Sequence, residues 1–278
     1  MNTKCTFLLS SYDNGEDCWE GFFKALQDQW PEMDLPIVLN TETKSYRYPG
    51  YEITTFGLHG GRKYTWGKRL LDTLKKIETP YILLFLEDYW LDQRVDDAFF
   101  RKTIEWMDEN PDIATFSYYP CLPGTNIDDG KFERFELRPQ ACEYRFNCQA
   151  SIWRRERLIE FIRPHESAWD WEVWGSMRAS RYPDRFYTLK EGAPMVFSYG
   201  DNLTGCIVHR GKWNKEAVMP FVERYGLDID FSIRGFEDWD EIHSSRKPTM
   251  IERLKMPHLK DRIINRVTTP YRRWRSLR

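Results

Sequence analysis

Two adjacent carboxylates, Glu87 and Asp88, follow the apolar run "YILLFL" at residues 81–86. An apolar run without polar alternation is typical of a strand that is covered on both faces of a parallel sheet. In such sheets, ligands bind beyond the carboxyl ends of the strands, where this pair would lie. Mg²⁺ suits the pair, because proteins hold it with one or two carboxylates plus substrate phosphates and water. A polar strand exit explains the same residues without any ligand.

A second acidic site lies in "SAWDWE" (167–172), where Asp170 and Glu172 are both candidates for a general base. Residues two apart on a helix do not share a face, so only one of them is expected to face a substrate. Ser167 and Asp170 have the spacing of a capping box, which gives Asp170 a structural role. We therefore prefer Glu172 as the base and keep Asp170 as the alternative.

Two basic segments could neutralise an anionic ligand. The first, "HGGRKYTWGKRL" (59–70), combines glycines with Arg62 and Arg69 but lacks the spacing of a P-loop. A solvated helix face explains Arg69 equally well.

The second basic segment, "HRGKW" (209–213), places His209, Arg210 and Lys212 around a glycine. A neutral histidine can ligate a metal, and the two cations can offset the charge of an anionic ligand. An ordinary surface loop would have the same composition.

The elements that position these groups follow from hydrophobic spacing. Apolar runs predict strands over 5–13, 35–43, 51–56, 81–86, 112–120 and 144–153. Helical spacing predicts helices over 17–30, with a capping box from Asp17 and Glu20, and near 65–77, 99–109, 154–162 and 165–180. We expect a loop or hairpin insertion at 121–139 and strands or strand–loop segments at 194–199 and 206–213. This order predicts an α/β fold with a largely parallel sheet.

In these motifs the chain resembles bacterial GT-A-type nucleotide-sugar glycosyltransferases of surface polysaccharide biosynthesis. The resemblance covers roughly residues 3 to 215, and it is carried by the order of "FLLSSYD", "YTWGKRLLDTLKKIETPYILLFLEDYWL", "FNCQASIWRRERL", "SAWDWEVWGS" and "HRGKW". It implies a GT-A-like, Rossmann-type, mostly parallel sheet flanked by helices. It also implies inverting transfer of a sugar from a nucleotide diphosphate sugar to a glycan or lipid-linked glycan acceptor.

The resemblance also assigns residues. The familiar metal motif Asp-x-Asp is here Leu86-Glu87-Asp88, so its first aspartate is missing and Asp88 takes the metal-binding position. A divalent metal, Mn²⁺ or Mg²⁺, is the implied cofactor, with His209 as a second ligand. Glu172 is the implied base. The implied nucleotide-sugar contacts are Asp13, Arg62, Trp66, Arg69, Glu87, Asp88, Asn147, Gln149, Arg210 and Lys212.

The end of the chain is basic, with 11 Lys and Arg against 2 Asp and Glu over 244–278. Met, Leu, Ile, Trp and Tyr are interspersed with these charges, a pattern that favours anionic membrane surfaces. Packing on the domain or non-specific contact with nucleic acid are the alternatives. We expect one glycosyltransferase domain over 1–243 and a basic amphipathic helical extension over 244–278.

Composition excludes several classes. The 278 residues are 41% hydrophobic and 30% charged, which excludes a disordered chain. The six cysteines form no C-x-x-C pair, and "CIVH" (206–209) has no second pair of zinc ligands. With no apparent signal peptide or membrane span, we expect a cytoplasmic protein with reduced thiols. Its tail would contact the inner face of the cell membrane.

Two rival functions stay open. Sugar-nucleotidyltransferases usually have a basic, glycine-rich signature after the first strand, whereas "SSYDNGEDCWEG" (10–21) contains no Lys or Arg. A non-catalytic protein that binds glycans, nucleotides or nucleic acid would fit the 16% aromatic content and the basic tail. The acidic body argues against a dedicated nucleic-acid binder.

Overall fold

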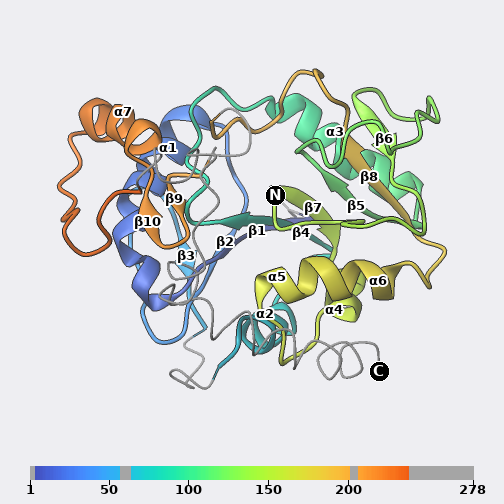
Figure 1. Ribbon diagram of the computed structural model, residues 1–278, viewed down its shortest axis with the longest axis horizontal. Helices are drawn as coiled ribbons and strands as arrows, with labels where there is room; N and C mark the ends of the chain where they lie inside the picture. The colour runs from blue at the N-terminus through green and yellow to red at the C-terminus, as the bar shows by residue number, and fades with distance from the viewer. Residues whose placement is uncertain (1–3, 57–63, 201–205, 238–278) are drawn as a thin grey trace, which may run out of the picture.

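The centre of the protein is an eight-stranded sheet with the strand order β3-β2-β1-β4-β7-β5-β8-β6. It is seen in a computed structural model that describes residues 4–56, 64–200 and 206–237 (Figure 1). The strands are β1 (Cys5–Ser10), β2 (Ile37–Asn40), β3 (Ile53–Thr54), β4 (Tyr81–Leu86), β5 (Ile113–Ser117), β6 (Phe135–Leu137), β7 (Ser151–Arg154) and β8 (Arg185–Leu189).

The predicted α/β class and mostly parallel sheet are confirmed. Strands β3, β2, β1 and β4 pair in parallel, as do β5 and β8. Strand β7 lies antiparallel between β4 and β5, and β6 is antiparallel to β8. The carboxyl ends of β1, β2 and β4 therefore meet along one edge, where the polar segments after these strands come together.

Both faces of the sheet are covered, which explains why the strands lack polar alternation. Phe7 and Phe85 point into one apolar cluster, together with residues of α1 (Trp19–Gln29) and α3 (Asp97–Glu109). Leu8 and Leu84 point into the other, with α2 (Trp66–Leu74) and α4 (Arg155–Phe161). Figure 1 shows these two helix layers on opposite sides of the sheet.

Some sequence predictions fail. Strand β8 and α7 (Lys215–Tyr225) were not predicted, and residues 194–199 contain no strand. Only 151–154 of the predicted strand 144–153 forms β7. The capping box of Asp17 and Glu20 is absent, because a 3₁₀ turn (Asp13–Cys18) runs into α1.

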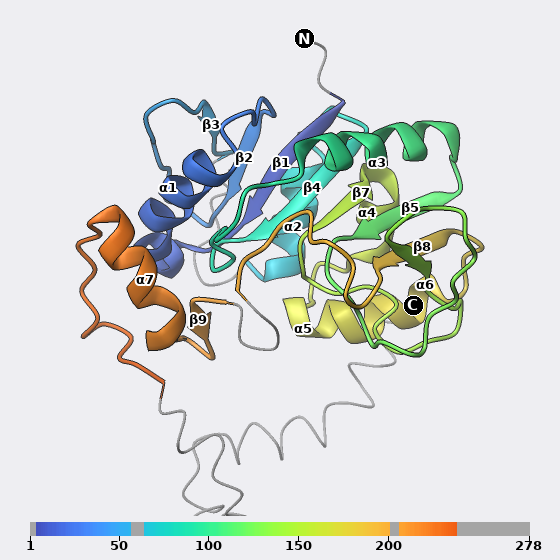
Figure 2. The ribbon, with the colours of Figure 1, turned by 90° about the horizontal axis from the view of Figure 1, so that it is seen from above.

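A hairpin and α7 border the carboxyl edge. Strands β9 (Val208–His209) and β10 (Lys212–Trp213) are joined by Arg210 and Gly211, which have φ angles of 51° and 82°. The Tyr225 hydroxyl donates to Asp28 at 2.8 Å, which holds α7 against α1. Figure 2 shows α7 and β9 on one side of this edge and α5 on the other.

The expected boundary between residues 243 and 244 and the basic tail lie outside the described residues. Within the described part of the chain, no helix combines the length and apolar character needed to cross a bilayer.

Candidate active site

The carboxylates Glu87 and Asp88 lie in a turn just past β4. Tyr89 donates its N–H to the Leu86 carbonyl at 3.3 Å, which ends the strand before the pair. Ile207 donates its N–H to the Asp88 carbonyl at 3.0 Å, so the segment leading into β9 is fixed beside this turn. Trp90 donates to the Glu87 carbonyl at 3.1 Å and is buried. The two large aromatics after the pair are therefore structural anchors.

Arg234, which the sequence analysis did not identify, provides a cation at this turn. Its Nε and Nη2 each donate to the Asp17 carboxylate at 2.6 Å, and its Nη2 also donates to the Asn14 carbonyl. Its Nη1 donates to the Tyr12 hydroxyl at 3.1 Å. A segment more than 200 residues away thus fixes the loop after β1.

Arg69 is the second buried cation of the site. It is ion-paired with Glu42 and donates to the Ser11 carbonyl at 2.8 Å. Burial raises the pKa of both Glu87 and Asp88, and their proximity raises that of Glu87 further. Arg234 lowers both pKa values, and Arg69 also lowers that of Glu87. The cations therefore only partly offset the cost of burying two carboxylates.

The raised pKa values of Glu87 and Asp88 predict how the stability of the protein depends on pH. Between the ordinary carboxyl pKa and the raised values, the folded state binds more protons than the unfolded state, so stability falls as pH rises. We expect the melting temperature to drop from pH 5 to pH 8. Replacing the pair, Glu87→Gln with Asp88→Asn, should raise stability at pH 8 by about 1–2 kcal/mol, a value discounted for partial exposure.

Thermal denaturation at several pH values measures this effect. The matched control is Glu105→Gln with Glu109→Gln, which removes two exposed carboxylates from α3. It should leave the pH dependence unchanged. A wild-type melting temperature that is constant or rises over this range would contradict the raised pKa values of Glu87 and Asp88.

Asp13 orders the loop after β2. Its Oδ1 accepts N–H bonds from Glu42, Thr43 and Lys44 at 3.1, 2.9 and 3.1 Å, and its Oδ2 accepts from the Thr43 hydroxyl. The structure therefore gives Asp13 a structural role. Its expected contact with a nucleotide remains a prediction.

Trp66 connects the first strand to the helix that carries Glu172. Its ring nitrogen donates to the Ser10 hydroxyl at 3.2 Å, and its ring lies 5.5 Å from that of Trp171. The next residue, Gly67, donates its N–H to the Glu166 carbonyl at 2.9 Å. A Cβ at residue 67 would lie 2.2 Å from the Arg163 carbonyl, so only glycine permits this contact.

Glu172 lies in a helix built from α5 (Ala168–Asp170), a π-helical turn (Trp171–Gly175) and α6 (Ser176–Ala179). The predicted capping box of Ser167 and Asp170 is present, so the Asp170 carboxylate is bonded to the helix start. Glu172 instead accepts the N–H of Cys148 at 2.8 Å. Burial raises its pKa, as expected for a base that works near neutral pH.

The two acidic sites meet at Cys148. Burial raises the pKa of its thiol, and the charges of Glu172 and Asp88 raise it further. Its neighbour Gln149 accepts a hydrogen bond from the Tyr199 hydroxyl at 2.9 Å, and the Tyr199 ring stacks on Tyr89 at 4.6 Å. The 147–149 segment therefore lies between the proposed base and the carboxylates after β4.

The Asn147 side-chain oxygen accepts the N–H of Gln149 at 3.2 Å, which is a local turn contact. This bond stabilises the segment that presents the Cys148 N–H to Glu172. A contact between the amides of 147 and 149 and a sugar remains a prediction.

The "HRGKW" segment forms the β9–β10 hairpin. His209 pairs through Nδ1 with Glu237, while Arg210 and Lys212 are exposed at and beside the turn. Their contacts with a diphosphate stay predictions. The Arg62 prediction lies outside the described residues.

The metal prediction has a partial structural basis. Among residues 4–56, 64–200 and 206–237, no group of three or more His, Cys, Asp or Glu side chains could hold a metal ion. Asp88 Oδ1, however, is buried without a hydrogen-bond partner among these residues. A single carboxylate oxygen suits a cation that takes its remaining ligands from phosphate and water. Asp88 therefore fits the role, and His209 has Glu237 as its observed partner.

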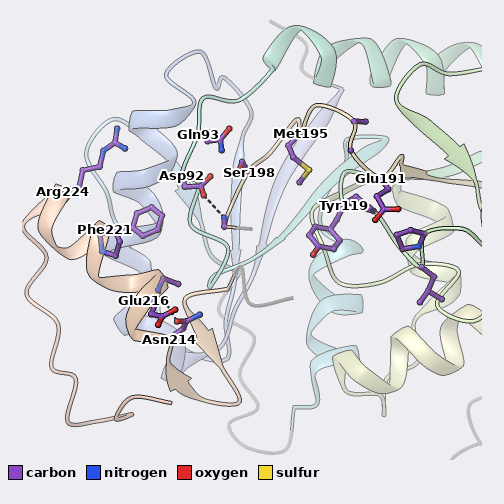
Figure 3. A pocket seen from close by; sticks show the side chains of 18 residues that line it. Asp92, Gln93, Tyr119, Glu191, Met195, Ser198, Asn214, Glu216, Phe221 and Arg224 are labelled. Atoms are coloured by element: carbon purple, nitrogen blue, oxygen red, sulfur yellow. Dashed lines mark hydrogen bonds between the residues drawn. The ribbon is translucent and has the colours of Figure 1, made fainter. Parts of the chain in front are cut away.

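A groove of about 1110 Å³ opens beside this site (Figure 3). One wall comes from α7 with Glu216, Phe221 and Arg224, and the opposite wall carries Tyr119 and Glu191. The tyrosines connect the groove to the site, because the Tyr119 ring stacks on Tyr199 at 6.4 Å and Tyr199 stacks on Tyr89.

Comparison with known proteins gives a weak likeness. No protein-family model matches the chain, and no curated protein matches it. The S. aureus TarS structure is 14% identical over 84% of this chain, with a TM-score of 0.46, and the TarS 1-349 structure covers 68% at 0.45. The chain spans only 41% and 59% of those two proteins.

A 2-C-methyl-D-erythritol 4-phosphate cytidylyltransferase from Thermus thermophilus is 12% identical, with a TM-score of 0.44. The match covers 79% of this chain and 98% of that chain. At these values the likeness carries no inference about activity.

Proposed function

We propose that the protein is an inverting glycosyltransferase. It moves a hexose-like sugar from a nucleoside diphosphate sugar to a hydroxyl of a glycan or lipid-linked glycan. The observation that carries the proposal is that the 147–149 segment connects the two acidic sites at the carboxyl edge of a mostly parallel sheet. Cys148 donates its N–H to Glu172, and Gln149 is hydrogen-bonded to Tyr199, whose ring stacks on Tyr89 next to Asp88. One carboxylate is available as a base, and a pair of carboxylates with nearby arginines lies where a diphosphate would bind.

In the proposed reaction, Glu172 takes the proton of the acceptor hydroxyl. The oxygen attacks the anomeric carbon as the bond between that carbon and the diphosphate oxygen breaks on the opposite face. The electron pair leaves with the nucleoside diphosphate, and Arg234 and Arg69 keep the site from becoming strongly anionic. When bound at Asp88, a divalent cation supplies positive charge to the leaving diphosphate.

The bond from the Cys148 N–H to Oε1 restrains the direction of the Glu172 carboxylate. In the proposed reaction, Oε2 takes the acceptor proton. The helix start holds Asp170 in its capping box, so Asp170 is the weaker candidate for the base. The role in surface polysaccharide biosynthesis and the membrane contact of 244–278 rest on the resemblance and the tail composition alone.

A thermal-shift screen against UDP, GDP, CMP and TDP, each with and without Mn²⁺, tests the proposal. A ligand that binds only the folded state stabilises it by mass action and so raises the melting temperature. At a ligand concentration of 100 times Kd, the free energy of unfolding increases by about 2.7 kcal/mol. We expect a shift with one nucleoside diphosphate that Mn²⁺ increases and that Asp88→Asn makes insensitive to Mn²⁺. If none of the four nucleotides changed the melting temperature, the proposal that the donor is a nucleoside diphosphate sugar would be overturned.

A further inference from the structure

The groove between α7 and the segments after β5 and β8 is open, mixed in polarity and not required by the chemistry described above. Its volume of about 1110 Å³ exceeds the roughly 300–1,000 Å³ of most small-molecule pockets, so it has room for more than one sugar unit. It lies on the carboxyl side of the sheet, and the tyrosines 119, 199 and 89 connect it to the turn that carries Asp88.

The charge of the groove is acidic. Three carboxylates line it, those of Asp92, Glu191 and Glu216, against the single guanidinium of Arg224. Arg224 is ion-paired with Asp28 at 2.6 Å, so its guanidinium already has an anionic partner. Within the described chain, Glu191 and Glu216 are exposed and have no ion pair. An anionic ligand would therefore meet repulsion here.

Asp92 is held in a fixed position in the lining of the groove. Its Oδ2 accepts the Gly200 N–H at 2.9 Å (dashed line in Figure 3), and its own N–H donates to the Ser198 carbonyl at 3.0 Å. Its Oδ1 is buried and has no hydrogen-bond partner among the described residues. Asp92 therefore adds a fixed negative charge to the groove, while the exposed Glu191 and Glu216 are the carboxylates that a ligand can reach.

The remaining lining is aromatic and apolar. Tyr119 and Phe221 lie on opposite walls, and aromatic faces of this kind pack against the C–H faces of sugar rings. Carboxylates with aromatic rings recognise hydroxyl-rich ligands, because the carboxylates accept hydrogen bonds from hydroxyl groups and the rings cover apolar faces.

We propose that this groove binds the acceptor, and that the acceptor is an oligosaccharide that is neutral or carries amino groups rather than acidic ones. The role of this oligosaccharide as an acceptor rests on the proposed glycosyltransferase function. Its binding to the groove does not rest on that function, since binding requires neither a donor nor Glu172.

Titration calorimetry with three sugar hexamers tests the proposal on the full chain. The probes are maltohexaose, which is neutral, the glucosamine hexamer, which is cationic at pH 6, and hexagalacturonate, which is anionic. We expect the first two to bind at least about tenfold more tightly than the third. Glu191→Gln with Glu216→Gln should weaken binding of the glucosamine hexamer by about three- to tenfold and narrow the gap between the neutral and anionic probes.

The matched control is again Glu105→Gln with Glu109→Gln on α3, which should change none of the three affinities. Equal or tighter binding of hexagalacturonate, no binding of the neutral and cationic hexamers at about 10 mM, or an unchanged affinity in the groove variant would overturn the proposal. Nucleotide binding without hexamer binding would overturn the assignment of the groove as a sugar site and leave the proposed glycosyltransferase function standing. Hexamer binding without nucleotide binding would keep the sugar site and remove its role as an acceptor site.

Discussion

Replacing Glu172 with glutamine is expected to lower kcat about 10²- to 10⁴-fold, the range that a positioned general base contributes. Glutamine has the same shape and can still accept the Cys148 N–H, so the 147–149 segment should stay in place. The Kd of the nucleoside diphosphate should therefore be unchanged. Initial rates of sugar transfer and a nucleotide titration measure the two quantities on the same protein.

Asp170→Asn is the matched control, because it changes the neighbouring carboxylate of the same helix. It weakens the capping box with Ser167, so we expect a loss of stability of about 1 kcal/mol and a nearly normal kcat. If Asp170→Asn removed activity while Glu172→Gln did not, the base would be Asp170. Near-normal turnover in both variants would exclude this helix as the source of the base.

Arg234→Met is expected to cost about 2–4 kcal/mol of stability, the lower part of the range for breaking a buried ion pair. Only 8% of the Arg234 side chain is exposed, and its loss leaves Asp17 unpaired and the Tyr12 hydroxyl without its donor. The loop after β1 then loses its restraint beside Glu87. We also expect nucleotide affinity to fall about tenfold. Thermal unfolding and nucleotide titration report the two effects separately.

The double variant Arg234→Met with Asp17→Asn separates fold from site. Removing both partners leaves no uncompensated charge, so most of the lost stability should return. Nucleotide affinity should stay low, because the cation beside Glu87 and Asp88 is still missing. If affinity returned together with stability, the role of Arg234 would be confined to holding the loop.

The sequence predicted best those elements whose signals are local. Strand β4 and a helix that begins near Thr65 were expected from neighbouring residues, and both form. The Ser167–Asp170 box is likewise a contact over three residues. Helix α7 was missed although it has an Asn214 N-cap and a Gly226 C-cap, because Pro220 interrupts its pattern.

Long-range partners could not be predicted. Asp17 and Glu20 have capping-box spacing, but Asp17 binds Arg234, which is 217 residues away. The same contact places a cation on a loop that contains no Lys or Arg of its own. The orientation of Glu172 depends on a Cys148 N–H that is available because 144–150 is irregular rather than a strand. No local pattern in the sequence reports either juxtaposition.

The π-helical turn Trp171–Gly175 makes chain length, rather than residue identity, decisive for the direction of Glu172. A π turn holds more residues than an α-helical turn, and each residue of an α-helix rotates the chain by about 100°. Deleting Val173 would restore regular winding and turn Glu172 away from Cys148 relative to α6. We therefore expect an insertion or deletion within this turn to change the direction of the Glu172 carboxylate even where every other side chain of the helix is kept.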